Sequence, residues 1–274
     1  MRIDNLENVT IADLAASFNT AFAGYFVPIN FSVEGMEERI RRARIDLQQS
    51  VGVFEGEKLV AFMLTGVGEE GHKKLAYNAG TGVIPAFRGQ RLVQRMYDWA
   101  EPKWRAAGFT DLTLEVIVEN DKAIKAYQRV GFTVDRRLVA YEYNSETAAV
   151  SSELLTEVRE LNWSAYAEIQ PFAFSWDYGR AGILAIAEDY RFYEWQEGGT
   201  IQAYAVVHKG RRIGQAGCRQ NDLEHWTQLL SALQKQHPEL SWINIDSRAS
   251  TVIKALQENE WEPIIEQFEM FRSL

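Results

Sequence analysis

Two pairs of segments in this chain echo each other, and this internal repetition constrains the fold more than any other feature. The segment AIKAYQRVGF at 123–132 is echoed by VIKALQENEW at 252–261, with Ile, Lys, Ala and Gln at matching places. The segments that precede them, LTLEVIVE at 112–119 and LSWINIDS at 240–247, echo each other as well. Two echoes in the same order indicate a duplicated domain rather than a chance match.

The length of the chain agrees with two domains. Its 274 residues are more than a single small core usually holds. The stretch NSETAAVSSE between the echoed regions is small and polar, as is typical of a linker. We therefore expect a first domain at 1–143, a linker at 144–153 and a second domain at 154–274.

Apolar periodicity and turn residues predict a mixed order of strands and helices in the first domain. The stretch VGVFEGEKLVAFMLTGV predicts two strands joined at Glu55–Glu57, and KLAYNAGTGVIP predicts a third strand that ends at Pro85. An amphipathic helix is expected between Gly89 and Gly108. The alternating strand DLTLEVIV then leads to a short helix that begins after an Asn-Asp cap.

Composition excludes several classes of function and of site. The net charge of −9 argues against a nucleic-acid partner, because phosphate neutralisation needs clustered Lys and Arg. The single cysteine, Cys218, rules out an intrachain disulfide and a cysteine-built zinc site. The histidines show no metal-ligand spacing, so we expect no metal. Since no long apolar run and no leader pattern occurs, we expect no membrane association and a cytoplasmic location.

Two motifs follow each other at a characteristic distance in the first domain. The first is a strand, a proline and an Arg-Gly turn that leads into a helix, with Val83, Pro85, Arg88, Gly89, Gln90 and Leu92. The second reads Asn-x-x-Ala-x-x-x-Tyr-x-x-x-Gly-Phe, with Asn120, Ala123, Tyr127, Gly131 and Phe132. Over roughly residues 50–143 this order resembles the GNAT superfamily of acyl-CoA-dependent N-acetyltransferases. With a decayed second copy behind it, the chain resembles a tandem GNAT protein.

The resemblance implies an α/β fold of two tandem GNAT-like acyltransferase domains, each a mixed, mostly antiparallel sheet flanked by helices. It also implies acetyl-CoA as co-substrate. A helix N-terminus with free N–H groups is a ready site for the pyrophosphate of coenzyme A, and arginines add charge-assisted hydrogen bonds. The residues that would bind the cofactor are Gly82, Val83, Arg88, Gly89, Gln90, Arg91, Leu92, Val93, Asn120, Ala123 and Tyr127.

One departure from the family pattern concerns the turn. Members of the family usually have small residues at the two places that Arg91 and Val93 occupy here. Glycine there lets the backbone approach the phosphates closely. Arg91 would therefore either replace that contact with its guanidinium or crowd the site.

The resemblance also implies catalytic roles. Tyr127 holds the place of the family's general acid, which protonates the leaving thiolate. The alternative is that Tyr127 is an aromatic residue that only packs in the core. A backbone N–H near Val83 would stabilise the oxyanion. Glu115 is the candidate base or water relay for the amine, and a purely structural role as an ion-pair partner is the alternative. The carboxylate of Leu274 is a further candidate base.

The acceptor is expected to be a primary amine of a small molecule, an amino acid or a peptide. Tyr25, Phe26 and Phe31 are candidates for its pocket, although packing in the core explains these aromatic residues equally well. The alternative function is a non-catalytic acyl-CoA sensor or interaction protein on the same fold. The expected partners are a coenzyme A thioester and a small amine, and a homodimer is compatible with the sequence.

The second copy is expected to be degenerate. At the place that matches Tyr127 it has Leu256, which cannot donate a proton, and at the place that matches Gly131 it has Glu260. Asp222 and Glu224 lie where the phosphates would bind, and like charges repel. We therefore expect only the N-terminal half to bind acyl-CoA.

Overall fold

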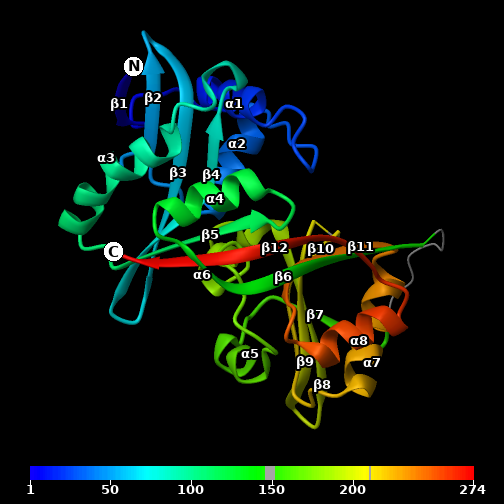
Figure 1. Cartoon of the computed structure of the whole chain (residues 1–274). Helices are drawn as coiled ribbons and strands as arrows, with labels where there is room; N and C mark the ends of the chain where they lie inside the picture. The colour runs from blue at the N-terminus through cyan, green and yellow to red at the C-terminus, as the bar shows by residue number, and fades with distance from the viewer. Residues whose placement is uncertain (146–151, 210) are drawn as a thin grey trace. The chain divides into compact units, whose positions relative to one another are not determined.

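The computed structural model describes residues 1–145, 152–209 and 211–274 and divides into two compact units (Figure 1). Unit 1 comprises Met1–Asp135 together with Glu269–Leu274, and unit 2 comprises Arg136–Phe268. This division differs from the expected domains 1–143 and 154–274, because each unit takes in a strand segment from the other side of the expected boundary. Most of the expected linker, residues 146–151, lies outside the described residues.

Unit 1 is built on a mixed sheet. Its strands lie in the order β1, β2, β3, β4, β5 and then the end of β12. Neighbours from β1 to β4 pair antiparallel, whereas β4 and β5 pair parallel. The strand bounds are β1 (Arg2–Asn5), β2 (Val51–Glu55), β3 (Lys58–Glu70), β4 (Lys73–Val83) and β5 (Asp111–Ile117).

The helices of unit 1 begin at residues suited to capping. Thr10, Ser32 and Asn120 each accept a hydrogen bond from a backbone N–H of the first turn that follows, which satisfies one of the free donors at a helix start. The helices are α1 (Ile11–Ala21), α2 (Val33–Arg42), the 3₁₀ turn η1 (Pro85–Phe87), α3 (Leu92–Ala106) and α4 (Asp121–Arg129). Among the described residues, no helix has the length and the apolar run needed to cross a membrane.

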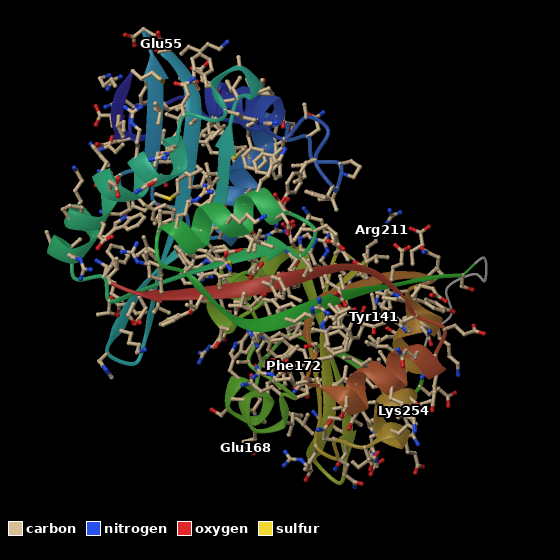
Figure 2. All side chains as sticks on the ribbon, viewed as in Figure 1. Glu55, Tyr141, Glu168, Phe172, Arg211 and Lys254 are labelled. Carbon is tan, nitrogen blue, oxygen red and sulfur yellow. The ribbon has the colours of Figure 1, made fainter. Side chains whose placement is uncertain are left out.

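Unit 2 repeats the same kind of architecture. Its strands lie in the order β6, β11, β10, β9, β8, β7, and only β10 and β11 pair parallel among the pairings described in full. Its core includes the completely buried Trp226 and Trp242, and Figure 2 marks Tyr141 on β6. The elements are β6 (Thr133–Asn144), β7 (Thr156–Val158), α5 (Trp163–Ile169), α6 (Arg180–Leu184), η2 (Ala187–Asp189), β8 (Tyr190–Glu197), β9 (Thr200–His208), β10 (Arg212–Cys218), α7 (Leu223–Gln236), β11 (Glu239–Asp246), α8 (Ser250–Glu258) and β12 (Glu262–Ser273).

The two units exchange strand segments. Most of β6 belongs to unit 2, where it pairs with β11. The last residues of β12 belong to unit 1, where the Leu274 N–H donates to the Thr110 carbonyl at 2.8 Å and the Thr113 hydroxyl donates to the Met270 carbonyl at 3.2 Å. Met270 is completely buried. The C-terminal end of the chain therefore completes the sheet of the N-terminal unit.

The internal echo of the sequence is also present in the backbone. In unit 1 the register of β3 and β4 shifts at Ala79, and in unit 2 the register of β9 and β10 shifts at Gly214. In each unit the bulged strand also pairs parallel with a neighbour, β4 with β5 and β10 with β11. The last pair of each parallel pairing lies one residue before the bulge, at Asn78–Leu114 and at Ile213–Trp242. A bulge bends a strand and increases its twist, so each unit has two parallel strands that diverge from the bulge onward.

Candidate active site

The bulge at Ala79 opens the sheet of unit 1 between β4 and β5. The carbonyl of Ala79 accepts a hydrogen bond from the Arg39 guanidinium at 2.8 Å, and the Gly80 N–H donates to Asn78 Oδ1 at 3.1 Å. The pairing described for β4 and β5 does not continue past Asn78, although β4 itself runs on to Val83. The end of β4 therefore presents backbone groups along an edge to which an extended ligand can add as a strand does.

The turn after β4 leaves the N-terminus of α3 without a side-chain cap. Arg91 occupies the N-cap position in the left-handed conformation, with φ 54° and ψ 29°, and makes no capping hydrogen bond. Gly89 has a φ of +80°, a conformation that glycine adopts at little cost. The N–H groups of the first turn of α3 thus have no partner within the helix, and the helix dipole adds partial positive charge at this end.

A cavity of about 300 Å³ opens at this helix end. Its charged lining residues are all cationic, and they come from the turn and from α4. A helix N-terminus ringed by guanidinium and ammonium groups is a site for a phosphate or pyrophosphate. The lining includes Val83, Arg88, Gly89, Gln90, Arg91, Leu92, Val93, Lys122 and Arg129.

Arg88 has a structural task in this turn. Its Nε donates to the Val83 carbonyl at 3.1 Å, and one terminal nitrogen donates to the Ala21 carbonyl at 2.9 Å. The side chain thereby ties the end of β4 to the end of α1. The sequence suggested only a phosphate ligand at this position.

Tyr127 lies on α4 and its side chain is buried. Burial raises the pKa of its phenol to about 12, while hydrogen bonds with Thr81 and Asn78 act in the opposite direction and the nearby Tyr25 phenol adds to the rise. At neutral pH the phenol therefore keeps its proton, which is the state that a general acid requires. Ring contacts with Phe132, at 6.0 Å between centroids, fix the tyrosine ring.

Asn78, Thr81 and Tyr97 form a polar group around Tyr127 that the motif analysis missed. Asn78 Oδ1 accepts from the Thr81 hydroxyl at 3.0 Å, and its Nδ2 donates to the Tyr97 hydroxyl at 2.9 Å. Burial raises the pKa of Tyr97 well above its usual value. The asparagine between Tyr77 and Ala79, in the middle of the strand KLAYNAGTGV, is the sequence signal that could have identified this group.

Asn120 has two contacts. Its Oδ1 accepts from the Ala123 N–H at 3.2 Å and caps α4, and its Nδ2 lies 3.4 Å from the Tyr25 hydroxyl. Burial raises the pKa of Tyr25, which its hydrogen bond with Asn120 partly offsets. The structure thus brings Asn120, Ala123 and Tyr25 together at the start of α4, and the Tyr25 phenol also lies near that of Tyr127.

The other two aromatic candidates are placed differently. Phe26 contacts the Tyr25 ring edge-on at 5.3 Å and is 53% exposed. Phe31 packs edge-on against Phe18 at 5.1 Å. Both backbone polar groups of Phe31 bond to the Asn19 side chain, so this phenylalanine serves to fix the segment between α1 and α2.

Glu115 lies on β5 and is partly buried. Its Oε2 accepts a hydrogen bond from the Tyr77 hydroxyl at 3.2 Å. Alternation along the strand places Glu115 on the face opposite to Leu114, the register partner of Asn78. Glu115 and the polar group around Tyr127 therefore lie on opposite faces of the sheet.

Gly82 is a glycine because of packing inside the unit. A Cβ at this position would lie 2.4 Å from the Phe62 ring and 2.9 Å from the Ala21 side chain. Any larger residue would push β4 away from β3 and α1. The glycine thus keeps the end of β4 in place.

At the corresponding place in unit 2, both diverging strands bind another segment of the chain. On β10, just past the bulge, the Gln215 amide donates to the Tyr178 carbonyl at 2.6 Å. On the diverging strand β11, the Asn244 amide donates to the Ser175 hydroxyl at 2.8 Å. Side chains of both diverging strands therefore hold the same segment, residues 169–178, between them.

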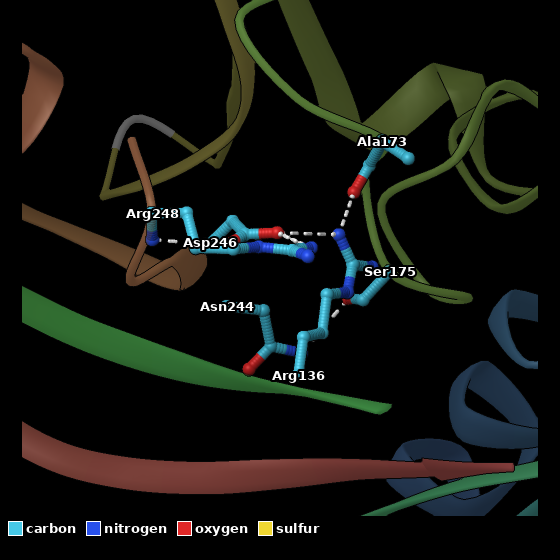
Figure 3. Close-up of polar contacts among 6 residues, drawn as sticks. All are labelled: Arg136, Ala173, Ser175, Asn244, Asp246 and Arg248. Atoms are coloured by element: carbon cyan, nitrogen blue, oxygen red, sulfur yellow. Dashed lines mark hydrogen bonds and ion pairs between the residues drawn. The ribbon is translucent and has the colours of Figure 1, made fainter. Parts of the chain in front are cut away.

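A charged group on β6 and after β11 fixes this segment further. The Arg136 guanidinium donates to the Ala173 carbonyl at 2.5 Å and lies 3.3 Å from the Asp246 carboxylate (Figure 3). Arg248 contacts the same carboxylate with two nitrogens. Its hydrogen bonds are the main cause that lowers the pKa of Asp246 to about 2, against the effect of burial. The segment at 169–178 is thus tied to a charge network.

The helix that follows β10 also differs from its counterpart in unit 1. Asp222 is the N-cap of α7, and its carboxylate accepts from the His225 N–H at 2.9 Å. An anionic cap satisfies a donor that α3 leaves free. In addition, Leu256 of α8 is completely buried in the core. Unit 2 therefore lacks the free helix end of unit 1 and has an apolar residue in place of the buried phenol.

Comparison with known proteins agrees with this division. Residues 15–132 match the model of the acetyltransferase (GNAT) family, whereas no curated protein sequence matches the chain. A GCN5-related N-acetyltransferase from Sphaerobacter thermophilus has 12% identity and a TM-score of 0.70 over 99% of this chain and 95% of that protein. A putative acetyltransferase from Pyrococcus horikoshii has 14% identity and a TM-score of 0.70 over 100% of this chain and 89% of that protein.

A third solved structure bears on the two-unit arrangement. It is a tandem GNAT protein from the clavulanic acid biosynthesis pathway, determined without AcCoA, with 11% identity and a TM-score of 0.60 over 99% of this chain and 98% of that protein. At such identities the likeness shows the fold, and it confirms the predicted fold of two tandem GNAT-like domains with mixed sheets and flanking helices. The family match lies within the N-terminal unit. Residues 15–132 therefore match the acetyltransferase (GNAT) family, and the chain as a whole has a tandem GNAT fold.

Proposed function

We propose that unit 1 transfers an acetyl group from acetyl-CoA to a primary amine of a small molecule, an amino acid or a peptide, with Tyr127 as the general acid. The observation that carries this proposal is the position of the buried Tyr127 phenol, a proton donor that hydrogen-bonds with Thr81 and Asn78 beside the diverging end of β4. A proton donor at this place serves a leaving thiolate, whose conjugate acid has a pKa of about 8.5.

The residues of unit 1 fit the parts of coenzyme A. The uncapped N-terminus of α3 and the cationic side chains of Arg91, Lys122 and Arg129 suit a pyrophosphate. The edge of β4 from Ala79 to Val83 suits an extended amide-bearing arm, which would take up backbone hydrogen bonds. The Arg88 guanidinium would position this edge through its bonds to Val83 and Ala21.

The proton transfers can be assigned to the residues of this chain. Acetyl-CoA, when bound, supplies the thioester carbonyl and the thiolate leaving group. Tyr127 would donate its proton to the departing sulfur, and Thr81 and Asn78 would hold the phenol in position. A backbone N–H at Val83 would donate to the carbonyl oxygen. Because an amine with a pKa of about 10 is mostly charged at neutral pH, Glu115 or a water that it binds would remove the amine proton.

Thiol release from acetyl-CoA tests the proposal. We expect release with at least one amine of a panel of small amines, amino acids and peptide N-termini. Tyr127→Phe removes one hydroxyl and little volume, so kcat should fall by about 10²–10⁴ while binding of acetyl-CoA persists. Tyr143→Phe, on β6, is the matched control and should keep full activity. Tight binding of acetyl-CoA without release for any amine would instead make the chain an acyl-CoA sensor.

The pH dependence separates the two roles of Glu115. If Glu115 is the base or holds the water relay, Glu115→Gln lowers kcat and removes the acidic limb of the pH–rate profile. If Glu115 only accepts the Tyr77 hydrogen bond, glutamine can replace it as an acceptor. The rate would then stay within about threefold of wild type over the whole pH range, and the base would have to be sought elsewhere.

A further inference from the structure

Unit 2 contains a cavity that none of the sequence motifs predicts. It has a volume of about 810 Å³ and is lined by the start of α5, by β8 and β9 and by the end of β10. Its polar lining carries both signs of charge, with Arg159 and Arg219 as cations and Glu160 and Glu194 as anions. Its apolar lining consists of Val158, Leu161, Ala165 and Ile201.

Glu194 is the unusual member of this lining, because its residue is only 4% exposed. Its Oε1 accepts a hydrogen bond from the Tyr166 hydroxyl and its Oε2 accepts one from the Gln196 amide, both at 2.5 Å. Both donors are neutral. Within the part of the chain that the structure describes, no Lys, Arg or His forms an ion pair with Glu194.

A buried carboxylate without a cation is costly, because burial removes its hydration and neutral donors compensate only in part. Burial and the contact with Glu194 raise the pKa of Tyr166, so the tyrosine remains a donor. A carboxylate has about four acceptor sites, and two of those of Glu194 are in use. The remaining sites suit a cationic group that enters the cavity.

The guanidinium of Arg219 supplies the opposite charge at the end of β10. Its Nε donates to the Ile201 carbonyl at 2.9 Å, which fixes the guanidinium at the cavity. Its nearest carboxylate is that of Glu168, at 4.0 Å from one terminal nitrogen, and Glu168 is 68% exposed on α5 (Figure 2). Arg219 can therefore still bind a carboxylate of a ligand.

We propose that this cavity binds a small zwitterion of the amino-acid class, with its ammonium group at Glu194, its carboxylate at Arg219 and an apolar side chain against Leu161 and Ile201. The site lies wholly within unit 2 and is separate from the acetyl-transfer site of unit 1.

Three probes that share one isobutyl side chain test the charge requirement. L-leucine carries both charges, 3-methylbutylamine carries only the ammonium group and 4-methylpentanoate carries only the carboxylate. In ligand-observed NMR titrations of the full chain without acetyl-CoA, L-leucine should bind at least about tenfold more tightly than either analogue, because each lost charge removes a charged hydrogen bond. Equal binding of 4-methylpentanoate, or no binding of L-leucine at millimolar concentration, would overturn the proposal.

Two variants place the binding at Glu194. Glu194→Gln keeps the shape and the acceptor for Tyr166 but removes the charge, so L-leucine should bind about tenfold more weakly or worse. Glu157→Gln, on β7 and outside the lining, is the control and should bind as wild type does. Ala165→Phe fills the cavity without touching Glu194 and should abolish binding. Acetyl-CoA titrations of all three variants should be unchanged, which checks folding. L-leucine binding that survives Glu194→Gln and Ala165→Phe would belong to another site and would overturn the assignment.

Discussion

Arg91 and Asp222 occupy the same position in the two units, the N-cap of the helix that follows the bulged strand. Arg91 makes no capping hydrogen bond and leaves the first N–H groups of α3 free, whereas Asp222 caps α7 with an anionic oxygen. An incoming phosphate meets positive charge at the first helix and a carboxylate at the second. The two helix ends therefore have opposite preferences for anions.

We expect one acetyl-CoA to bind per chain. The free helix end and the open strand edge occur together in unit 1, while unit 2 holds residues 169–178 between its diverging strands. Isothermal titration calorimetry should give a stoichiometry of one. Asp222→Asn, which removes the repelling charge, should leave that value unchanged because the segment still fills the opening. A stoichiometry of two for the wild-type chain would show that unit 2 binds the cofactor as well.

The backbone at Arg91 predicts an effect on stability. In the folded protein, a non-glycine residue in the left-handed conformation is strained by about 1–2 kcal/mol, and glycine avoids this strain. Glycine also makes the unfolded chain more flexible, which offsets part of the gain in stability. Arg91→Gly should therefore raise the free energy of unfolding by up to about 1 kcal/mol in urea titrations. Arg95→Gly, inside α3, should lower it by about 1 kcal/mol. Equal losses in both variants would mean that Arg91 stabilises the turn through its side chain.

Arg88 should affect the folded protein as well as its ligand. Its guanidinium donates to the carbonyls of Val83 and Ala21, so Arg88→Ala should lower the free energy of unfolding, measured without ligand, by about 1–3 kcal/mol. Binding of acetyl-CoA should weaken in parallel. Gln90→Ala, in the same exposed turn, should change stability by less than about 0.5 kcal/mol. Weaker binding with unchanged stability would restore a direct phosphate contact as the sole role of Arg88.

The raised pKa of Tyr127 predicts where its phenol titrates. In the unfolded chain a tyrosine ionises near its ordinary pKa of about 10, and in the folded protein the value is about 12. The stabilisation that follows is complete below about pH 10 and is lost as the pH rises toward 12. The ultraviolet absorbance of tyrosinate, compared between wild type and Tyr127→Phe, should not differ up to about pH 10.5. A difference that titrates near pH 10 would contradict the argument that burial raises the pKa of Tyr127.

Met270 links the end of the chain to the stability of unit 1. Since its side chain is completely buried, Met270→Ala should lower the free energy of unfolding by about 2–5 kcal/mol. Hydrogen exchange should quicken in β5, whose Thr113 bonds to the Met270 carbonyl. Ile264→Ala, at a 47% exposed position of the same strand, is the control and should have little effect. Faster exchange confined to unit 2 would show that the last residues do not support β5.

Local features could be predicted from the sequence, because they depend on neighbours along the chain. Asn120 was expected to cap α4 and Asp222 to stand at the start of α7, and both do. The tandem fold was likewise predictable from the echoed segments. The caps rest on the local preferences of a short segment, and the tandem fold rests on the repetition of segments along the chain.

Features that depend on long-range pairing could not be predicted. Residues 136–144 and 269–274 have the alternation of any strand, and nothing in that pattern says which unit they join. The filling of the opening in unit 2 depends on Asn244 and Gln215, which are ordinary polar residues until the fold brings residues 169–178 between them. Glu194 was overlooked for the same reason, since its burial is decided by Tyr166 and the cavity wall.

The exchanged end of β12 sets an order of events during synthesis. The N-terminal unit carries the acetyltransferase motifs, yet its sheet has an open edge at β5 until residues 269–274 are available. Until these residues have left the ribosome, this edge has no partner and can pair wrongly. The sheet of the N-terminal unit is therefore complete only once residues 269–274 have been synthesised, and a chain truncated before residue 269 carries both motifs of this unit without the strand that supports them.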